Sequence, residues 1–216
     1  STTTTRNIFV NVLQVYEVSV QVSGDSSKKG DPGDELIFEM TIKNKGNGED
    51  TVSLSLEGEK ASWASIVDEV ELTSGESKTV NLTVNIDDDA TVGDNDIIVN
   101  GTSEDNPSAY DTGTVKVSVN KQFKVDVVVS SKSGDPGSTV QYDVRIQNEG
   151  TGVDTFTVNV DDYPAGWSVD PVSFQVEDVE AGGEKLVTLN VSIRSGEDNK
   201  AFTINLTASS DEAQKE

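Results

Sequence analysis

The residues that could perform chemistry in this chain are carboxylates, hydroxyls and amides, because its 216 residues include no histidine and no cysteine. Without these two residue types the chain cannot form a Ser-His-Asp triad, a thiolate nucleophile, a disulfide or the usual zinc and haem sites. Paired carboxylates could in principle hydrolyse glycosides, but with 39 Asp and Glu residues some pair will always lie at a suitable separation. We therefore expect no enzyme and no required cofactor.

The densest group of carboxylates lies in one loop, after an expected strand that ends at Ile86. It consists of Asp87, Asp88, Asp89, Asp94 and Asp96. Hard oxygen ligands in a flexible loop suit Ca²⁺, which takes about six to eight oxygens. The spacing does not match an EF-hand, and a solvated acidic loop is the simpler interpretation. Calcium binding is kept as a hypothesis beside that interpretation.

Four Asn-x-Ser/Thr sequons are candidate sites for N-linked glycans, and they begin at Asn81, Asn100, Asn190 and Asn205. Strand alternation turns each asparagine away from the expected core, because its apolar neighbours point inward. We also expect Asn100 and Asn205 to occupy equivalent positions. N-glycosylation requires an exported protein, whereas the alternative is chance sequons on a threonine-rich β-surface.

The chain is strongly acidic, with 16 Lys and Arg residues against 39 Asp and Glu residues and a formal net charge of −23. Such a field repels phosphate backbones and anionic lipids, which argues against nucleic-acid and membrane-surface partners. No apolar run approaches the ~18 residues that a membrane-spanning helix needs. We therefore expect neither nucleic-acid binding nor membrane insertion.

Short β-strands must position these residues, because apolar and polar residues alternate along much of the chain. The chain also repeats itself: Gly-Asp-Pro-Gly at 30–33 recurs at 134–137, and Trp63 recurs as Trp167, both 104 residues later. In the first copy the expected strands are 16–22, 35–42, 51–56, 67–72, 79–86, 96–102 and 114–119, and the second copy repeats them from 123 to 207. Seven short strands per copy without helical periodicity predict an all-β chain of two tandem immunoglobulin-like (Ig-like) β-sandwiches.

Two motifs carry a resemblance to a known family. Each copy has Gly-Asp-Pro-Gly, then a strand, then Asn-x-Gly-x-Gly-x-Asp-Thr, which occupies 44–51 and 148–155. This pattern resembles the Ig-like repeats of archaeal and bacterial cell-surface proteins, of the CARDB-like and NPCBM-associated type. The resemblance covers nearly the whole chain and implies an extracellular location on S-layer-like or other surface proteins. It brings no catalytic residue with it.

The ends of the two copies do not match. Ile8, Val10 and Val12 align with 115, 117 and 119 at a separation of 107 residues, so residues 7–13 look like the last strand of a preceding sandwich. The second copy, in contrast, has no equivalent of the strand 114–119. The expected domains are therefore an N-terminal donor-type strand (1–14), a first sandwich (15–120) and a second, incomplete sandwich without its final strand (121–216).

A sandwich that lacks its last strand presents an open edge that another chain can complete. If the strand 7–13 of one subunit fills the gap in the next, with Ile8, Val10 and Val12 directed inward, the contact is head-to-tail and builds a homopolymer. The sequence thus predicts a secreted structural protein, processed from a precursor with a signal peptide, that forms an archaeal surface filament or layer. The alternative is an adhesive or carbohydrate-associated pair of modules cut from a larger surface protein, with a glycan or cell-surface partner.

Overall fold

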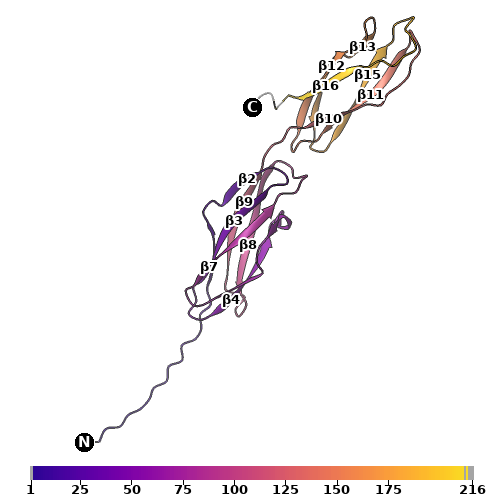
Figure 1. Cartoon of the computed structure of the whole chain (residues 1–216). Coiled ribbons are helices and arrows are strands. Elements are labelled where there is room, and N and C mark those ends of the chain that lie inside the picture. Colours follow the sequence, from indigo (N-terminus) through magenta and orange to yellow (C-terminus); the bar gives the residue numbers. More distant parts are fainter. Residues whose placement is uncertain (1, 212, 214–216) are drawn as a thin grey trace. The chain divides into compact units, whose positions relative to one another are not determined.

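The structure is a computed structural model that describes residues 2–211 and 213. The chain is all-β and divides into two compact units (Figure 1). Unit 1 comprises Ser1–Asp88 and Asp94–Ser118, and unit 2 comprises Asp89–Gly93 and Val119–Glu216. Each unit is an Ig-like β-sandwich of two sheets, which confirms the predicted fold class. No helix in the described part of the chain is long and apolar enough to cross a membrane.

Unit 1 has one sheet with the strand order β1-β3-β7-β5 and another with the order β2-β9-β8-β4-β6. The bounds are β1 (Val18–Ser23), β2 (Ser27–Gly30), β3 (Glu35–Asn44), β4 (Asp50–Glu57), β5 (Ala64–Ser65), β6 (Glu69–Leu72), β7 (Ser77–Asn85), β8 (Gly93–Ser103) and β9 (Tyr110–Val119), with a short 3-10 helix at Ala61–Trp63. Alternation decides what is buried: Phe38, Met40 and Ile42 of β3 lie in the core, whereas Ile37 is exposed.

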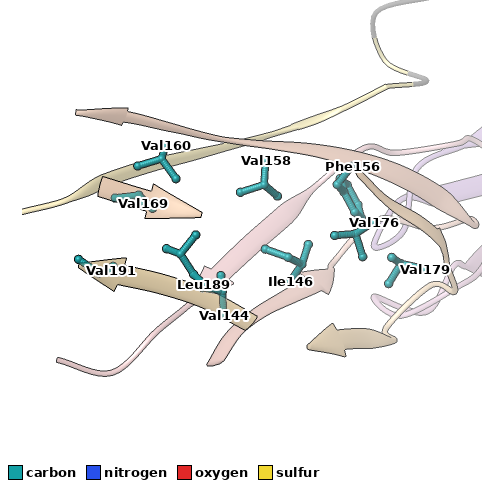
Figure 2. Packing of buried hydrophobic residues seen from close by; sticks show 10 residues of the cluster. All are labelled: Val144, Ile146, Phe156, Val158, Val160, Val169, Val176, Val179, Leu189 and Val191. Atoms are coloured by element: carbon teal, nitrogen blue, oxygen red, sulfur yellow. The ribbon is translucent and has the colours of Figure 1, made fainter. Parts of the chain in front are cut away.

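Unit 2 repeats this plan with fewer strands, in the orders β10-β11-β15-β13 and β14-β12-β16. The bounds are β10 (Val125–Val128), β11 (Thr139–Asn148), β12 (Asp154–Asp162), β13 (Ser168–Asp170), β14 (Ser173–Val179), β15 (Glu184–Ser192) and β16 (Asn205–Ser210). Figure 2 shows the core, in which side chains from both sheets point toward one another. Its buried members are Val144, Ile146, Phe156, Val158, Val160, Val169, Val176, Val179, Leu189 and Val191.

The repeated Gly-Asp-Pro-Gly run forms the same turn before β3 and before β11. In unit 1, Asp34 N donates to Asp31 O at 3.1 Å, and Gly33 has a φ of 85°. Proline fixes φ at the second position of such a turn and glycine supplies the positive φ at the third. The turn therefore sets where the long central strand of the first sheet begins.

The pairing of strands shows which residues of the two units are equivalent. Leu36 pairs with Val84 in unit 1, and Val140 pairs with Val191 in unit 2. The separation between equivalent residues is therefore 104 in β3 and β11 and 107 in β7 and β15. It is also 107 in the first strands, because Val18 pairs with Asn44 and Val125 pairs with Asn148.

One predicted equivalence is wrong. Asn100 of β8 pairs with Ser55 of β4, and Thr207 of β16 pairs with Asn159, which is the equivalent of Ser55. The equivalent of Asn100 is therefore Thr207, not Asn205. The pairing of β12 with β16 has an irregularity between Val160 and Asp162, so that Asn205 lies beyond the regular ladder.

Candidate functional site

Among its described residues, unit 2 has no equivalent of β9. In unit 1, β9 lies between β2 and β8, whereas β16, the equivalent of β8, is an edge strand among the described residues of unit 2. Two flanking segments differ as well: 131–134, the equivalent of β2, and 200–204, the equivalent of the start of β8, are not in strands. We call this vacant strand position, between β16 and 131–134, the acceptor slot.

A groove of about 900 Å³ lies at the acceptor slot. Its apolar lining comes from both sheets and includes Val140, Tyr142, Trp167, Leu189, Val191, Ile193, Ile204 and Leu206. Its rim is polar and includes residues 130–134 and 197–200. An apolar floor between two segments that are in no strand suits an extended peptide, because its backbone can pair with them while alternate side chains fill the floor.

The side chains along the slot are buried in unit 1 and only half-buried in unit 2. Ile97 and Val99 are fully buried beside β9, whereas their equivalents Ile204 and Leu206 are half-buried. Other equivalent residues show the same difference. Phe38, Trp63, Val18 and Val20 are buried in unit 1, whereas their equivalents in unit 2 are half-buried, namely Tyr142, Trp167, Val125 and Val127. Tyr142, Trp167, Ile204 and Leu206 line the groove at the acceptor slot, where no strand lies beside β16 among the described residues.

The N-terminal segment has the opposite defect, since it carries a row of apolar side chains but belongs to no sheet. Residues 2–17 are in no strand (Figure 1). Ile8, Val10 and Val12 are 89%, 82% and 76% exposed, whereas Val115, Val117 and Val119 of β9 are buried. Soluble proteins rarely leave such a row of apolar side chains uncovered. We call residues 7–13 the donor segment.

The chain enters both units in the same way. In unit 1, Asn47 N donates to Val15 O at 3.2 Å, and in unit 2, Thr151 N donates to Gln122 O at 3.1 Å. Val15 and Gln122 are 107 residues apart, the same separation that aligns the donor segment with β9. Along the chain, the donor segment therefore precedes unit 1 as β9 precedes unit 2.

The Asn-x-Gly-x-Gly motif forms the surface on which this entering chain rests. Asn44 is buried, its Oδ1 accepts from Gly46 N at 2.8 Å, and its Nδ2 donates to Gly48 O at 2.8 Å. A Cβ on Gly46 would lie 2.3 Å from Val15 O, so only glycine lets the chain pass. The sequence indicated a turn here. It did not reveal that the entering chain docks on this motif. The available signal was that both glycines recur in the second copy.

Each unit anchors its tryptophan on a carboxylate. Trp63 Nε1 donates to Asp87 Oδ2 at 2.7 Å, and Trp167 Nε1 donates to Glu197 Oε2 at 2.9 Å. The hydrogen bond from Trp167 holds the pKa of Glu197 below its ordinary value. The Trp167 ring also packs on Phe202, with ring centroids 5.0 Å apart. The Trp167 side chain is thus held in place and half-buried at the groove.

The five acids of the predicted calcium site are not brought together. Asp87 accepts from Trp63, while Asp94 accepts from Ser118 Oγ at 2.6 Å and pairs with Lys116 Nζ at 3.5 Å. The Ser118 hydrogen bond lowers the pKa of Asp94. The side chains of Asp88, Asp89 and Asp96 are exposed. Within residues 2–211 and 213, no three His, Cys, Asp or Glu side chains are arranged to hold a metal ion.

All four sequon asparagines lie on strands. Asn81 in β7 and Asn205 in β16 are exposed, and Asn100 in β8 and Asn190 in β15 are half-buried. Asn81, Asn100 and Asn190 alternate with buried residues of their strands, and Asn205 lies between the half-buried Ile204 and Leu206, which agrees with the predicted outward orientation. Glycosylation at these sites stays a prediction.

No family model and no curated protein matches the chain. Among solved structures, a protein of unknown function from Porphyromonas gingivalis W83 is 17% identical, over 80% of this chain and 83% of that chain, with a TM-score of 0.35. The secreted serine protease VesC from Vibrio cholerae is 15% identical over 90% of this chain and 51% of its own length, with a TM-score of 0.37. The CARDB domain of a Pyrococcus furiosus protein, in complex with di-metal ions, is 16% identical over 49% of this chain and 89% of that domain, with a TM-score of 0.34. These likenesses are distant and concern the Ig-like fold alone.

Proposed function

We propose that this chain is an extracellular structural subunit that polymerises by inserting the donor segment of one copy into the acceptor slot of the next. The observation that carries the proposal is a pair of matching defects. Unit 2 has a strand-shaped gap with an exposed apolar floor, and the N-terminus has an apolar segment with strand alternation that belongs to no sheet. Unit 1 supplies the template, because β9 fills the corresponding position there.

Burial of the donor segment would drive the assembly. Complete burial of Ile8, Val10 and Val12 contributes about 5–8 kcal/mol before the cost of ordering the strand. Backbone hydrogen bonds to β16 on one side and to 131–134 on the other would add to this. Phe9 and Asn11 would face outward, as their equivalents Lys116 and Ser118 do in β9.

The contact would be heterologous, because the donor segment and the acceptor slot are different surfaces of the chain. Heterologous contacts that do not close on themselves continue into a filament. The partner of the chain is thus a second copy of itself, and the role is structural rather than enzymatic. A net charge of −23 suits a polymer that must stay dispersed in solution.

The proposal includes an exported location at the cell surface and N-linked glycans on Asn81, Asn100, Asn190 and Asn205. It is supported by the position of all four sequons on strands, with their asparagines alternating with core residues. Mass spectrometry of the protein purified from its natural source tests this part. Unmodified peptides at all four sites would refute it.

Disulfide cross-linking tests strand insertion directly, because the chain contains no cysteine of its own. In unit 1 the side chains of Ser118 and Asp94 touch, so their equivalents Asn11 and Ala201 should face each other after insertion. An N11C/A201C variant is expected to give a ladder of covalent multimers on a non-reducing gel. Each single variant can give dimers at most, and N7C/A201C, four residues out of register, should give no ladder.

Two outcomes would contradict the proposal. A cross-linked monomer would show that the donor segment fills the slot of its own chain. Monomers without any cross-link, together with an absence of filaments in electron micrographs of the full chain, would refute polymerisation. In the expected case, filaments form from the full chain and not from a version that lacks residues 1–12. That deletion keeps Leu13, whose carbonyl accepts from Asn47 Nδ2 at 3.0 Å.

A further inference from the structure

We infer that Arg6, directly before the donor segment, pairs with Asp126 of the acceptor unit, and that this ion pair selects the inserted strand and its register. The inference rests on the proposed function and names the residues that make it specific. Three residue exchanges between the complete unit 1 and the open unit 2 carry the argument.

The first exchange makes room for a side chain. By the alignment of the donor segment with β9, Arg6 takes the place of Gly113. Gly113 is buried, and a Cβ there would lie 2.9 Å from Met40 Cε and 3.1 Å from Val20 Cγ1. In unit 1 a side chain at this point of the strand would require the end of Met40 and the Val20 side chain to shift. In unit 2 the equivalent of Met40 is Val144, whose side chain ends at Cγ and lacks the obstructing atom.

The second exchange moves a carboxylate from the inserted strand to β10 of the accepting unit. In unit 1, Val20 N donates to Asp111 Oδ2 of β9 at 2.9 Å. In unit 2 the equivalent amide, Val127 N, donates to Asp126 Oδ1 at 2.9 Å. The inserted strand no longer brings a carboxylate, because the equivalent of Asp111 is Thr4. The open unit already carries the carboxylate at the place where the strand will arrive.

The third exchange puts a cation on the strand. Arg6 is the single charged residue among residues 1–16 of a chain with a net charge of −23. The Cβ built at Gly113 lies 3.5 Å from Val20 O, so the Arg6 side chain would start beside Val127, the residue whose amide binds Asp126. Unit 1 has the neutral Ser19 where unit 2 has Asp126. Cation and carboxylate thus occur together, at the open slot.

The same exchanges would reject the wrong strand. A strand of the β9 type would bring Asp111 against Asp126, and two carboxylates in contact repel each other. Specificity of this kind needs a repulsive element as well as an attractive one, and Asp126 supplies both. The acceptor slot is therefore built for the N-terminal strand of another copy rather than for a β9 exchanged between subunits.

Charge reversal in the full chain tests the pair. The critical concentration for polymerisation, measured by sedimentation, is expected to rise at least about tenfold in R6E and in D126R, because each places like charges together. The double variant R6E/D126R should return to within about threefold of the wild type. The matched control is D143R, which makes the same charge change on the exposed face of β11 and should neither raise the critical concentration nor rescue R6E.

The folding of D126R is checked by circular dichroism, while Arg6 lies outside both sandwiches, so R6E cannot act by unfolding them. If R6E and D126R show no mutual rescue while the N11C/A201C ladder persists, the ion pair is wrong and strand insertion stands. If the wild-type chain forms neither filaments nor ladder, both proposals fall together. Rescue of R6E by D126R and not by D143R would confirm the pair.

Discussion

The central residue of the donor segment offers the sharpest test of strand insertion. Val10 is equivalent to Val117, which is fully buried in unit 1. In the free chain Val10 is 82% exposed, so an aspartate there meets water on all sides. In the polymer the same aspartate would point into the apolar floor of the acceptor slot. The substitution Val10→Asp should therefore act on assembly and leave the folding of each unit unchanged.

The size of the effect follows from burial. Loss of the buried valine costs about 1.5–2 kcal/mol. Desolvation of the new carboxyl group without a partner costs at least about 2 kcal/mol more. The sum, about 4 kcal/mol, corresponds to roughly a thousandfold weaker insertion. The critical concentration measured by sedimentation should rise accordingly, while the thermal melt recorded by circular dichroism should not move.

The neighbouring residue provides a matched control. Asn11→Asp introduces the same carboxylate one position later, where alternation directs it outward, as it directs Ser118 in β9. Its effect should not exceed a few-fold, because an exposed charge remains solvated. Equal weakening by Val10→Asp and Asn11→Asp would refute the inferred orientation of the strand. Normal assembly of both variants would show that the donor segment is not the inserted strand.

Three further predictions concern unit 2. In a Trp63→Phe variant, Trp167 emission should shift to shorter wavelength on assembly, because Trp167 would become buried like Trp63, which is 4% exposed; unchanged emission in filaments would contradict this. Asn148→Ala removes a buried amide that donates to two carbonyl oxygens at 2.8 and 2.7 Å. It should lower the free energy of unfolding by about 3 kcal/mol in urea titrations. A loss of less than about 1 kcal/mol would contradict a structural role for these two hydrogen bonds. The lowered pKa of Glu197 gives stability that is present above the ordinary value of 4.5 and lost as pH falls through the lowered pKa. Acid should therefore change Trp167 emission in the wild type and not in Glu197→Gln.

The sequence predicted the fold well because the signals for it are local. In β3, for example, every second residue is apolar, and this period of two holds only for a strand with one buried face. The two copies of the Gly-Asp-Pro-Gly turn and of the tryptophan then gave the number of sandwiches. The imbalance between 7–13 and 114–119 gave the open slot, because a repeat exposes any strand that it lacks.

What the sequence did not predict depends on contacts between distant residues. The predicted equivalence of Asn100 and Asn205 failed because an irregularity in the pairing of β12 and β16 leaves no mark in the alternation. The acids at 87–96 looked like one site, yet Asp94 is held by Ser118 from another strand. Asp111, whose carboxylate accepts from Val20 N, is likewise 91 residues from Val20 in the chain. Only the folded unit therefore reveals that Asp126 takes its place in unit 2.

The separation of donor segment and acceptor slot on different units has a consequence for the direction of a filament. A polymer joined in this way is polar, since one end carries an unfilled slot and the other a free strand. The two ends then require chemically different terminators: a peptide like residues 3–13 would block the first, and a truncated sandwich would block the second. An anchor at the cell surface that offers only one of these would decide which end points outward and at which end new subunits arrive.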